Sequence, residues 1–310
     1  MSDLAFYCFQ YALALLLAPL LPGIIARIKA KVAGRHGKPV LQLYFDIFKG
    51  LRKGEVISQV TTPVFTLGPM VGLATVLCAL ALLPLGGMAS PLRFSGDFLL
   101  AAYLLGLGRF LTMLAALDTG SSFEGMGASR EAAFSALSEP VLFLCLLTLV
   151  GVGSTLGMHD ALSLSGMLGG RPAHEWLLGR AELLLVPVVF FVLLLVENSR
   201  IPVDDPTTHL ELTMIHEVMI LDHSGPSLSF IEYGAALKLW FFAALPAGIL
   251  VPDLPLWQQS LCWLACIFAV AVLVGIVESV MARLRMQKVP VLLGGAAVLS
   301  ALALILTQVR

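Results

Sequence analysis

The chain has 310 residues, of which 58% are hydrophobic and only 13% are charged, and its net charge at neutral pH is −1. This composition excludes a water-soluble domain, since soluble proteins have about 45–50% apolar and about 25% charged residues. It also excludes the basic surface that nucleic-acid binding needs. The apolar residues gather in runs long enough for helices of about 20 residues to cross a bilayer. The sequence therefore predicts an all-α polytopic membrane protein that forms one domain over residues 1–310.

About eight membrane-spanning helices are predicted, in the ranges 4–26, 63–86, 97–117, 133–157, 180–196, 233–251, 258–281 and 289–309. The first range is expected to be a retained span and not a cleaved signal, because its basic residues follow the apolar run. Prolines in or beside four of the spans (Pro19, Pro69, Pro187 and Pro246) are tolerated in membrane helices.

The loop between the first two spans carries eight of the nineteen basic residues. Within it, residues 40–53 place Leu41, Tyr44, Phe45 and Phe48 on one helical face, which predicts an amphipathic helix in the membrane interface. The positive-inside rule makes this loop cytoplasmic. With the spans alternating, thirteen basic residues lie on the cytoplasmic side and four on the other, which favours an even number of spans.

The cysteine and histidine positions do not form a metal-ligand set. All five cysteines lie inside apolar runs and are expected to be small buried hydrophobic residues. His209, His216 and His223 are spaced by seven residues, so on one helix they would be about 10 Å apart, too far to bind one ion. We expect these histidines to face solvent or a partner protein.

Ionisable residues at membrane depth are costly and therefore indicate function. The densest group runs from Asp118 to Pro140 and places Asp118, Glu124 and Arg130 near the cytoplasmic end of two spans. Glu131 is expected at the same end and Glu139 deeper, about two turns into the fourth span, with Glu131, Ser135, Ser138 and Glu139 on roughly one helical face. Burial disfavours the charged form of a carboxylate, so Glu139 with these serines and water is a candidate proton relay. Alternatively, Glu139 closes an internal hydrogen bond or pairs with a basic residue.

Other isolated charges lie inside predicted spans. Arg109 and Lys238 are candidate partners of carboxylates such as Glu139 or Glu232, whereas Glu278 is expected to form an interfacial ion pair. Glu182, close to the outer face, is compatible with either a functional role or an ion pair.

A long acidic loop, about residues 197–232, separates the fifth and sixth spans. Pro202 and Pro206 hold its first part extended, and Thr207 or Thr208 is expected to begin a helix. That helix would carry an apolar stripe of Leu210, Met214, Val218 and Leu221. Such a stripe must be covered by this chain or by a peripheral protein.

Three motifs resemble one family. The first motif lies in the first loop, where the family's spacing is matched by Arg35, Gly37, Pro39, Gln42, Asp46 and Lys49. The second motif is DTGSSFEGMGASREAAFSALSEP, in which Glu139 occupies the position of the family's intramembrane glutamate. The third motif is ENSRIPVDDP. The chain resembles the complex I subunit beside the quinone chamber, and more closely its relatives in formate hydrogenlyase and other energy-converting NiFe hydrogenases. After Pro206, complex I relatives have further carboxylates where this chain has Thr207, Thr208 and His209, which favours the hydrogenase branch and puts quinone binding in doubt.

The resemblance implies a membrane-anchoring, energy-coupling subunit in the cytoplasmic membrane of a prokaryote, with its long loops in the cytoplasm. It binds no cofactor itself. Its implied partners are the NiFe large and small subunits, a ferredoxin-like iron–sulfur subunit and antiporter-like membrane subunits. The implied relay residues are Glu131, Glu139, Asp118, Glu124, Glu197, Asp204 and Glu211, with Arg109, Arg130, Arg200 and Lys238 as charge partners; the peripheral arm would contact Arg35, Gln42, Asp46, Lys49 and Asp205.

Three alternatives remain open from the sequence: a quinone-chamber subunit of a complex I-like oxidoreductase, a free-standing transporter, and a purely structural anchor. The absence of two repeated halves argues against the transporter.

Overall fold

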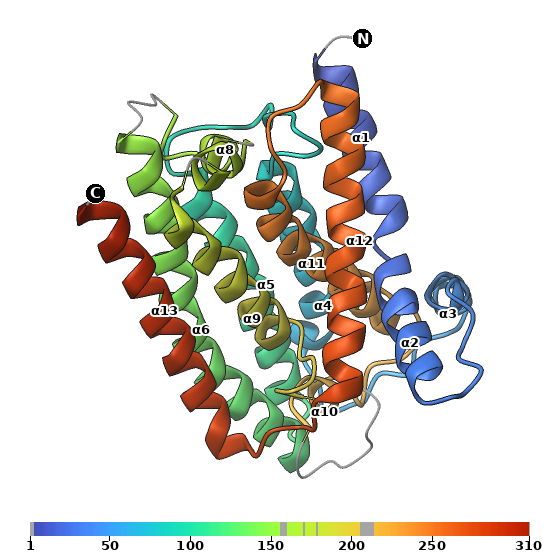
Figure 1. Cartoon of the computed structure of the whole chain (residues 1–310). Helices are drawn as coiled ribbons and strands as arrows, with labels where there is room; N and C mark the ends of the chain where they lie inside the picture. The colour runs from blue at the N-terminus through green and yellow to red at the C-terminus, as the bar shows by residue number, and fades with distance from the viewer. Residues whose placement is uncertain (1–2, 156–159, 170, 178, 205–213, 310) are drawn as a thin grey trace.

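The computed structural model describes residues 3–155, 160–169, 171–177, 179–204 and 214–309. Its helices and two 3-10 turns are α1 (Asp3–Leu17), α2 (Leu20–Val32), α3 (Gln42–Leu51), α4 (Pro63–Leu82), α5 (Asp97–Asp118), α6 (Ser122–Thr155), α7 (Leu164–Leu168), α8 (Arg171–Leu177), η1 (Ala181–Leu184), α9 (Leu185–Glu197), α10 (His216–Met219), α11 (Gly225–Leu250), α12 (Leu256–Val280), η2 (Met286–Lys288) and α13 (Val289–Val309). The long helices run side by side as one bundle (Figure 1). The predicted all-α membrane architecture is confirmed.

The described helices include six that are long and apolar enough to cross a membrane singly: α4, α5, α6, α11, α12 and α13. The first predicted span is instead a pair, α1 and α2, bent by 42°. The fifth is α9, whose 13 residues reach only about 20 Å at 1.5 Å per residue. All eight predicted ranges therefore contain apolar helix, and the count of eight crossings stays a prediction.

The bend between α1 and α2 lies at Pro19, which has no backbone N–H to donate to the carbonyl of Leu15. Two tyrosines from other elements use the carbonyls that the bend exposes. The Tyr233 hydroxyl of α11 donates to Leu15 O at 3.1 Å, and the Tyr44 hydroxyl of α3 donates to Leu16 O. The bend is therefore joined to both α3 and α11.

Helix α11 lies at the centre of the bundle (Figure 1). In the most apolar stretch of α11, 78% of the residues are buried, against 28–39% in the corresponding stretches of the other five long helices. Trp240, at its middle, is fully buried. Charged side chains on α11 therefore face protein and not lipid.

One predicted helix boundary and one predicted helix need correction. Helix α6 begins at Ser122, eleven residues before the predicted start of the fourth span, so the second motif is mostly helical and only residues 119–121 connect it to α5. The helix predicted from Thr207 is wrong over its described part, where only the four residues of α10 are helical. Residues 205–213 lie outside the described part of the chain.

Long-range side-chain contacts explain the missing helix. The Asp204 carboxylate accepts from the backbone N–H of Ile215 at 2.9 Å and of His216 at 3.4 Å. Arg130 donates to Met214 O at 2.8 Å. These contacts use backbone groups that a continuous helix would need for its own ladder.

Candidate functional site

Arg109, in the middle of α5, is almost buried and faces three carboxylates. Its Nη2 lies 2.9 Å from Glu197 Oε2, its Nη1 lies 3.4 Å from Glu139 Oε1, and its Nε lies 3.8 Å from Glu131 Oε1. Glu131 and Glu139 come from α6 and Glu197 from the end of α9. One guanidinium thus contacts carboxylates as far as 88 residues away from it in the chain.

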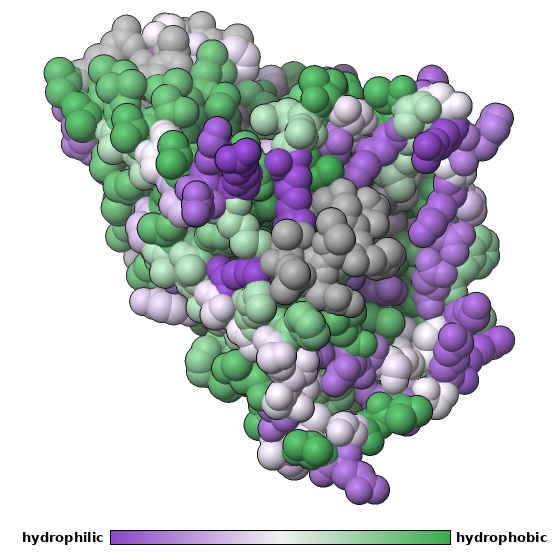
Figure 2. All heavy atoms as spheres, turned by 90° about the horizontal axis from the view of Figure 1, so that it is seen from below, coloured by the Kyte–Doolittle hydropathy of each residue, from purple (hydrophilic) through white to green (hydrophobic). Residues whose placement is uncertain are grey.

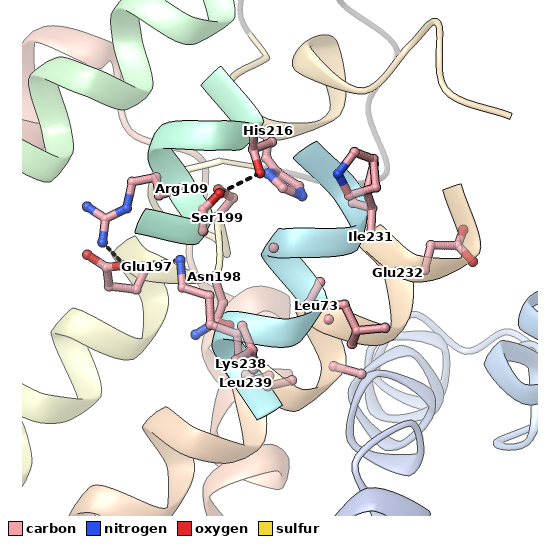
Figure 3. A pocket seen from close by; sticks show the side chains of 18 of the residues that line it. Leu73, Arg109, Glu197, Asn198, Ser199, His216, Ile231, Glu232, Lys238 and Leu239 are labelled. Atoms are coloured by element: carbon pink, nitrogen blue, oxygen red, sulfur yellow. Dashed lines mark hydrogen bonds and ion pairs between the residues drawn. The ribbon is translucent and has the colours of Figure 1, made fainter. Parts of the chain in front are cut away.

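Glu197 has two further partners. Lys238 of α11 places its Nζ 3.1 Å from Glu197 Oε2, and the Ser138 hydroxyl donates to Glu197 Oε1 at 2.7 Å. We call Arg109, Glu131, Glu139, Glu197 and Lys238 the Arg109 cluster. Figure 3 shows Arg109 and Glu197 pointing toward one another, with Lys238 beside them.

The Arg109 cluster contains more carboxylates than cations. Two side chains carry fixed positive charge and three are acidic. The four more buried members, Arg109, Lys238, Glu131 and Glu197, balance one another in charge, so the third carboxyl group, on the half-exposed Glu139, is the surplus one. Glu197 makes three close polar contacts, whereas Glu131 and Glu139 of α6 each make one longer contact to Arg109.

Glu139 occupies a different position from the one predicted. Its side chain is 49% exposed, whereas Glu197 is the deeply buried member of the cluster. Successive residues on an α-helix point about 100° apart, so Ser138 faces the protein interior while Glu139 turns toward the outside of the bundle. The pairing of Glu139 with Arg109 matches one of the two predicted alternatives.

A cavity of about 270 Å³ lies beside the cluster. Arg109, Glu131, Glu197 and Lys238 line one side of it, and Glu232 stands at the other (Figure 3). Its remaining wall is largely apolar and is contributed in part by Pro22, Leu43, Leu73, Val76 and Leu105. Charged and apolar surfaces therefore share one internal space.

A second, smaller space of about 10 Å³ lies between the cluster and α6, lined by Glu131, Ser135, Ser138, Glu197 and Ser199 among others. That volume is close to the minimum for one water molecule, and its wall combines these polar side chains with the apolar Phe134, Val196, Val203 and Ile215. The predicted association of Glu131 with the two serines is thus present, with Glu197 in the place predicted for Glu139.

His216, at the start of α10, also lines the large cavity. Burial lowers the pKa of His216, and the nearby cations Lys238 and Arg200 act in the same direction, while Glu217 and Asp204 oppose it. Its imidazole is therefore neutral at pH 7, available both to donate and to accept a proton.

Asp118 and Glu124 do not join the cluster. Asp118 accepts from the backbone and hydroxyl of Thr62 at 2.6 Å and 3.0 Å. The buried Glu124 accepts from the backbone N–H of Asp222 at 3.2 Å. Both carboxylates connect the α5–α6 turn to neighbouring segments.

Glu278 in α12 forms an ion pair with each of two cations. It lies 3.1 Å from Lys29 of α2 and 3.5 Å from Arg200, and its side chain is completely buried. We call Lys29, Arg200 and Glu278 the Glu278 clasp. This confirms the predicted ion pairing of Glu278; its partners come from regions that sequence spacing alone does not connect.

Asp204, predicted as a relay residue, is buried and lies 2.8 Å from Arg283 in the α12–α13 connection. Because it also accepts from the backbone at residues 215 and 216, it holds two parts of the acidic loop together. Glu211, the other predicted relay residue of this loop, lies outside the described residues.

His223 differs from the expectation of a solvent- or partner-facing histidine. It is buried and its ring stacks on Phe65 of α4 with 4.0 Å between ring centroids. His209 lies outside the described residues.

The four described residues predicted to contact a peripheral arm lie on the loop between α2 and α3 or on α3 itself. Arg35, Asp46 and Lys49 are exposed and Gln42 is half-buried; Asp205 lies outside the described residues. Figure 2 looks at the end of the molecule where this loop lies and shows hydrophilic side chains gathered there. Among the described residues, no three His, Cys, Asp or Glu side chains are grouped closely enough to hold a metal ion.

Comparisons with known proteins agree with this architecture. Residues 5–309 match the NADH dehydrogenase family. The chain is 31% identical to hydrogenase-4 component C of Escherichia coli K12 over 89% of this chain and 87% of that protein. It is 29% identical to formate hydrogenlyase subunit 4 of the same organism, over 88% of each.

A solved structure shares the fold. It is a chain of the membrane-bound sulfane sulfur reductase, an archaeal respiratory membrane complex, with a TM-score of 0.82, 17% identity, and coverage of 99% of this chain and 100% of that one.

Proposed function

Because the chain belongs to the NADH dehydrogenase family, we propose that it is the membrane-anchoring and energy-coupling subunit of a multi-subunit NiFe hydrogenase of the formate hydrogenlyase kind. The similarity to hydrogenase-4 component C and formate hydrogenlyase subunit 4 over most of each chain supports the hydrogenase branch. The observation that supports the coupling role is the Arg109 cluster, in which three carboxyl groups, one of them on the half-exposed Glu139, share two cations beside a cavity.

The partners in this proposal are the NiFe large and small subunits, a ferredoxin-like iron–sulfur subunit and antiporter-like membrane subunits. The NiFe centre and the clusters belong to the partners. The peripheral arm would sit on the cytoplasmic loops, including Arg35, Gln42, Asp46, Lys49 and Asp205. The protein would lie in the inner membrane of a prokaryote, with these loops on the cytoplasmic side.

In this proposal, the segment from Glu197 to Asp204 connects the cytoplasmic loops that carry the peripheral arm to the Arg109 cluster. It carries Glu197 at one end and Asp204 at the other, where Asp204 pairs with Arg283. A shift of charge in the arm that moves this segment would change the distance from Glu197 to Arg109 and Lys238. Movement of this loop would thereby change the electrostatic surroundings of the carboxyl groups inside the membrane.

Arg109 is shared between Glu197 and the carboxyl groups of α6. When Glu197 moves away, the guanidinium favours the ionised forms of Glu131 and Glu139, because an opposite charge nearby stabilises the charged state. A proton is then released through the half-exposed Glu139 toward a neighbouring membrane subunit. When Glu197 returns, the α6 residues take up a proton from the polar space lined by Ser135 and Ser138.

Replacing Glu139 by Gln in the assembled complex tests this proposal. Glu139→Gln is expected to abolish proton translocation into membrane vesicles while the peripheral arm stays attached. Glu175→Gln is the matched control, because it removes a carboxylate that pairs with Arg180 at 3.2 Å, away from the cluster. Translocation that survives Glu139→Gln would rule out the relay through this residue.

A second candidate function is quinone binding in the large cavity. Such a site needs a wall formed by the first span and the amphipathic helix, and Pro22 of α2 and Leu43 of α3 both line this cavity. Activity with a soluble acceptor in quinone-free detergent, resistant to quinone-site inhibitors, is the result expected for the hydrogenase branch. A strict requirement for quinone would select the complex I-like alternative.

A further inference from the structure

Helix α3 has three faces with different surroundings. Its inner face packs on α11, where the Ser229 hydroxyl reaches Ile47 O at 3.3 Å and only a glycine fits at position 50. A second face carries the polar residues Gln42, Asp46 and Lys49.

The third face of α3 is exposed and apolar. Leu41, Phe45 and Phe48 are 50%, 59% and 56% exposed. Figure 1 shows α3 end-on beside the upright α2, so its axis crosses the direction of the spans at the flank of the bundle. A helix placed in this way meets protein on one face, water on another and lipid acyl chains on the third.

Two glycines bring the chain after α2 back along that helix. A Cβ atom at Gly37 would lie 2.5 Å from the Ala30 side chain and 3.7 Å from Cα of Arg27, and one at Gly23 would lie within 2.1 Å of Val40 O. Segment 37–40 therefore runs against α2 before α3 begins. This arrangement brings Gly37, the residue before Lys38, close to the backbone of Arg27.

Three cations lie in this corner: Arg27 and Lys31, four residues apart on α2, and Lys38 on the returning segment. We call them the α2–α3 elbow. All three are exposed, and no ion pair joins them to another residue in the described part of the chain. No acidic residue occurs in the sequence between Asp3 and Asp46. Lys29, the remaining cation of α2, instead contacts Glu278.

We propose that the α2–α3 elbow binds the headgroup of an anionic phospholipid whose acyl chains lie against the exposed apolar face of α3. The charge of the elbow is complementary to a phosphate-bearing headgroup, and the neighbouring apolar face is complementary to its acyl chains. A peripheral protein would account for the cations but not for three large apolar side chains on a helix in the plane of the membrane interface. Arg52, whose guanidinium lies 4.0 Å over the Phe48 ring, marks where that face meets the polar region.

The test reconstitutes the full-length chain in phosphatidylcholine with spin-labelled phosphatidylglycerol or spin-labelled phosphatidylcholine, and measures the motionally restricted fraction of each label. The unmodified chain is expected to prefer phosphatidylglycerol, and added salt should weaken that preference. The double variant Arg27→Gln/Lys31→Gln should lower the preference at least about fivefold, since each basic residue near an anionic surface contributes about that factor.

The matched control is Arg285→Gln/Lys288→Gln, which removes two exposed cations from the connection between α12 and α13 and should lower the preference less than the test variant does. The charge-conserving double variant Arg27→Lys/Lys31→Arg should retain it. An equal motionally restricted fraction of both labelled lipids with the unmodified chain would overturn the proposal. Equal losses of lipid preference in the test and control variants would also overturn it. Loss of the peripheral subunits from Arg27→Gln/Lys31→Gln with an unchanged lipid preference would assign the elbow to a protein partner and also overturn it.

Discussion

Buried charge in this protein is arranged in two contrasting ways. In the Glu278 clasp a single carboxylate, with no exposed side-chain surface, lies between two cations, Lys29 and Arg200. In the Arg109 cluster three acidic side chains share two cations and line a cavity. A carboxylate enclosed between two cations joins the segments that carry them and stabilises the fold. Surplus carboxylate next to open space can exchange a proton.

The largest expected effect on stability is at the clasp. Glu278→Gln removes the only acidic partner in the clasp and leaves two cations facing an amide, a change expected to cost roughly 3–5 kcal/mol of unfolding free energy. Thermal unfolding of the purified protein in detergent measures it. The same substitution at Glu131 is the comparison variant and should cost less than about 1 kcal/mol, because it removes the charge excess of the cluster. Similar losses at the two positions would remove the distinction between the two regions.

A smaller loss is expected at the loop that connects the two regions. Asp204→Asn weakens the 2.8 Å pair with Arg283 and keeps an oxygen that can accept from the Ile215 N–H. The expected cost is about 1–3 kcal/mol, with faster amide hydrogen exchange at residues 214–216. Unchanged exchange there would show that Asp204 does not hold this segment.

The smallest expected effect concerns pH. Burial lowers the pKa of His223 below its ordinary value of 6.5, so the unfolded chain binds more protons than the native one between the two pKa values. Stability from this residue is therefore full above pH 6.5 and falls as the pH drops below that value. His223→Phe keeps a ring against Phe65 and should flatten the decline in melting temperature between pH 7.5 and 5.5. An unchanged slope would mean that His223 does not contribute to it.

Much of the fold follows from the sequence, because apolar length alone determines where helices can cross a membrane. The bend at Pro19 does not, since prolines at 69 and 246 lie inside continuous helices. What differs at Pro19 is the presence of Tyr44 and Tyr233 beside the exposed carbonyls, and these residues are distant in the chain.

The sequence predicts most of the residues of the candidate site but not which of them contact one another. The spacing of Glu131, Ser135 and Ser138 correctly indicated one face of α6, whereas Glu139 lies at the edge of that face, half-exposed but 3.4 Å from Arg109. The pairs of Glu197 with Arg109 and Lys238, and of Glu278 with Lys29, could not be derived from spacing, because each joins helices that are far apart in sequence. Charge at membrane depth was the signal that identified all of them.

The proton of the Arg109 cluster can be observed directly by infrared difference spectroscopy of the assembled complex in H₂O and D₂O during turnover. The account predicts the band of a protonated carboxyl group that shifts on deuteration, disappears in Glu131→Gln or Glu139→Gln, and persists in Glu278→Gln. A complex without such a band, or a band unaffected by both α6 substitutions, would contradict the claim that this cluster holds the transferred proton.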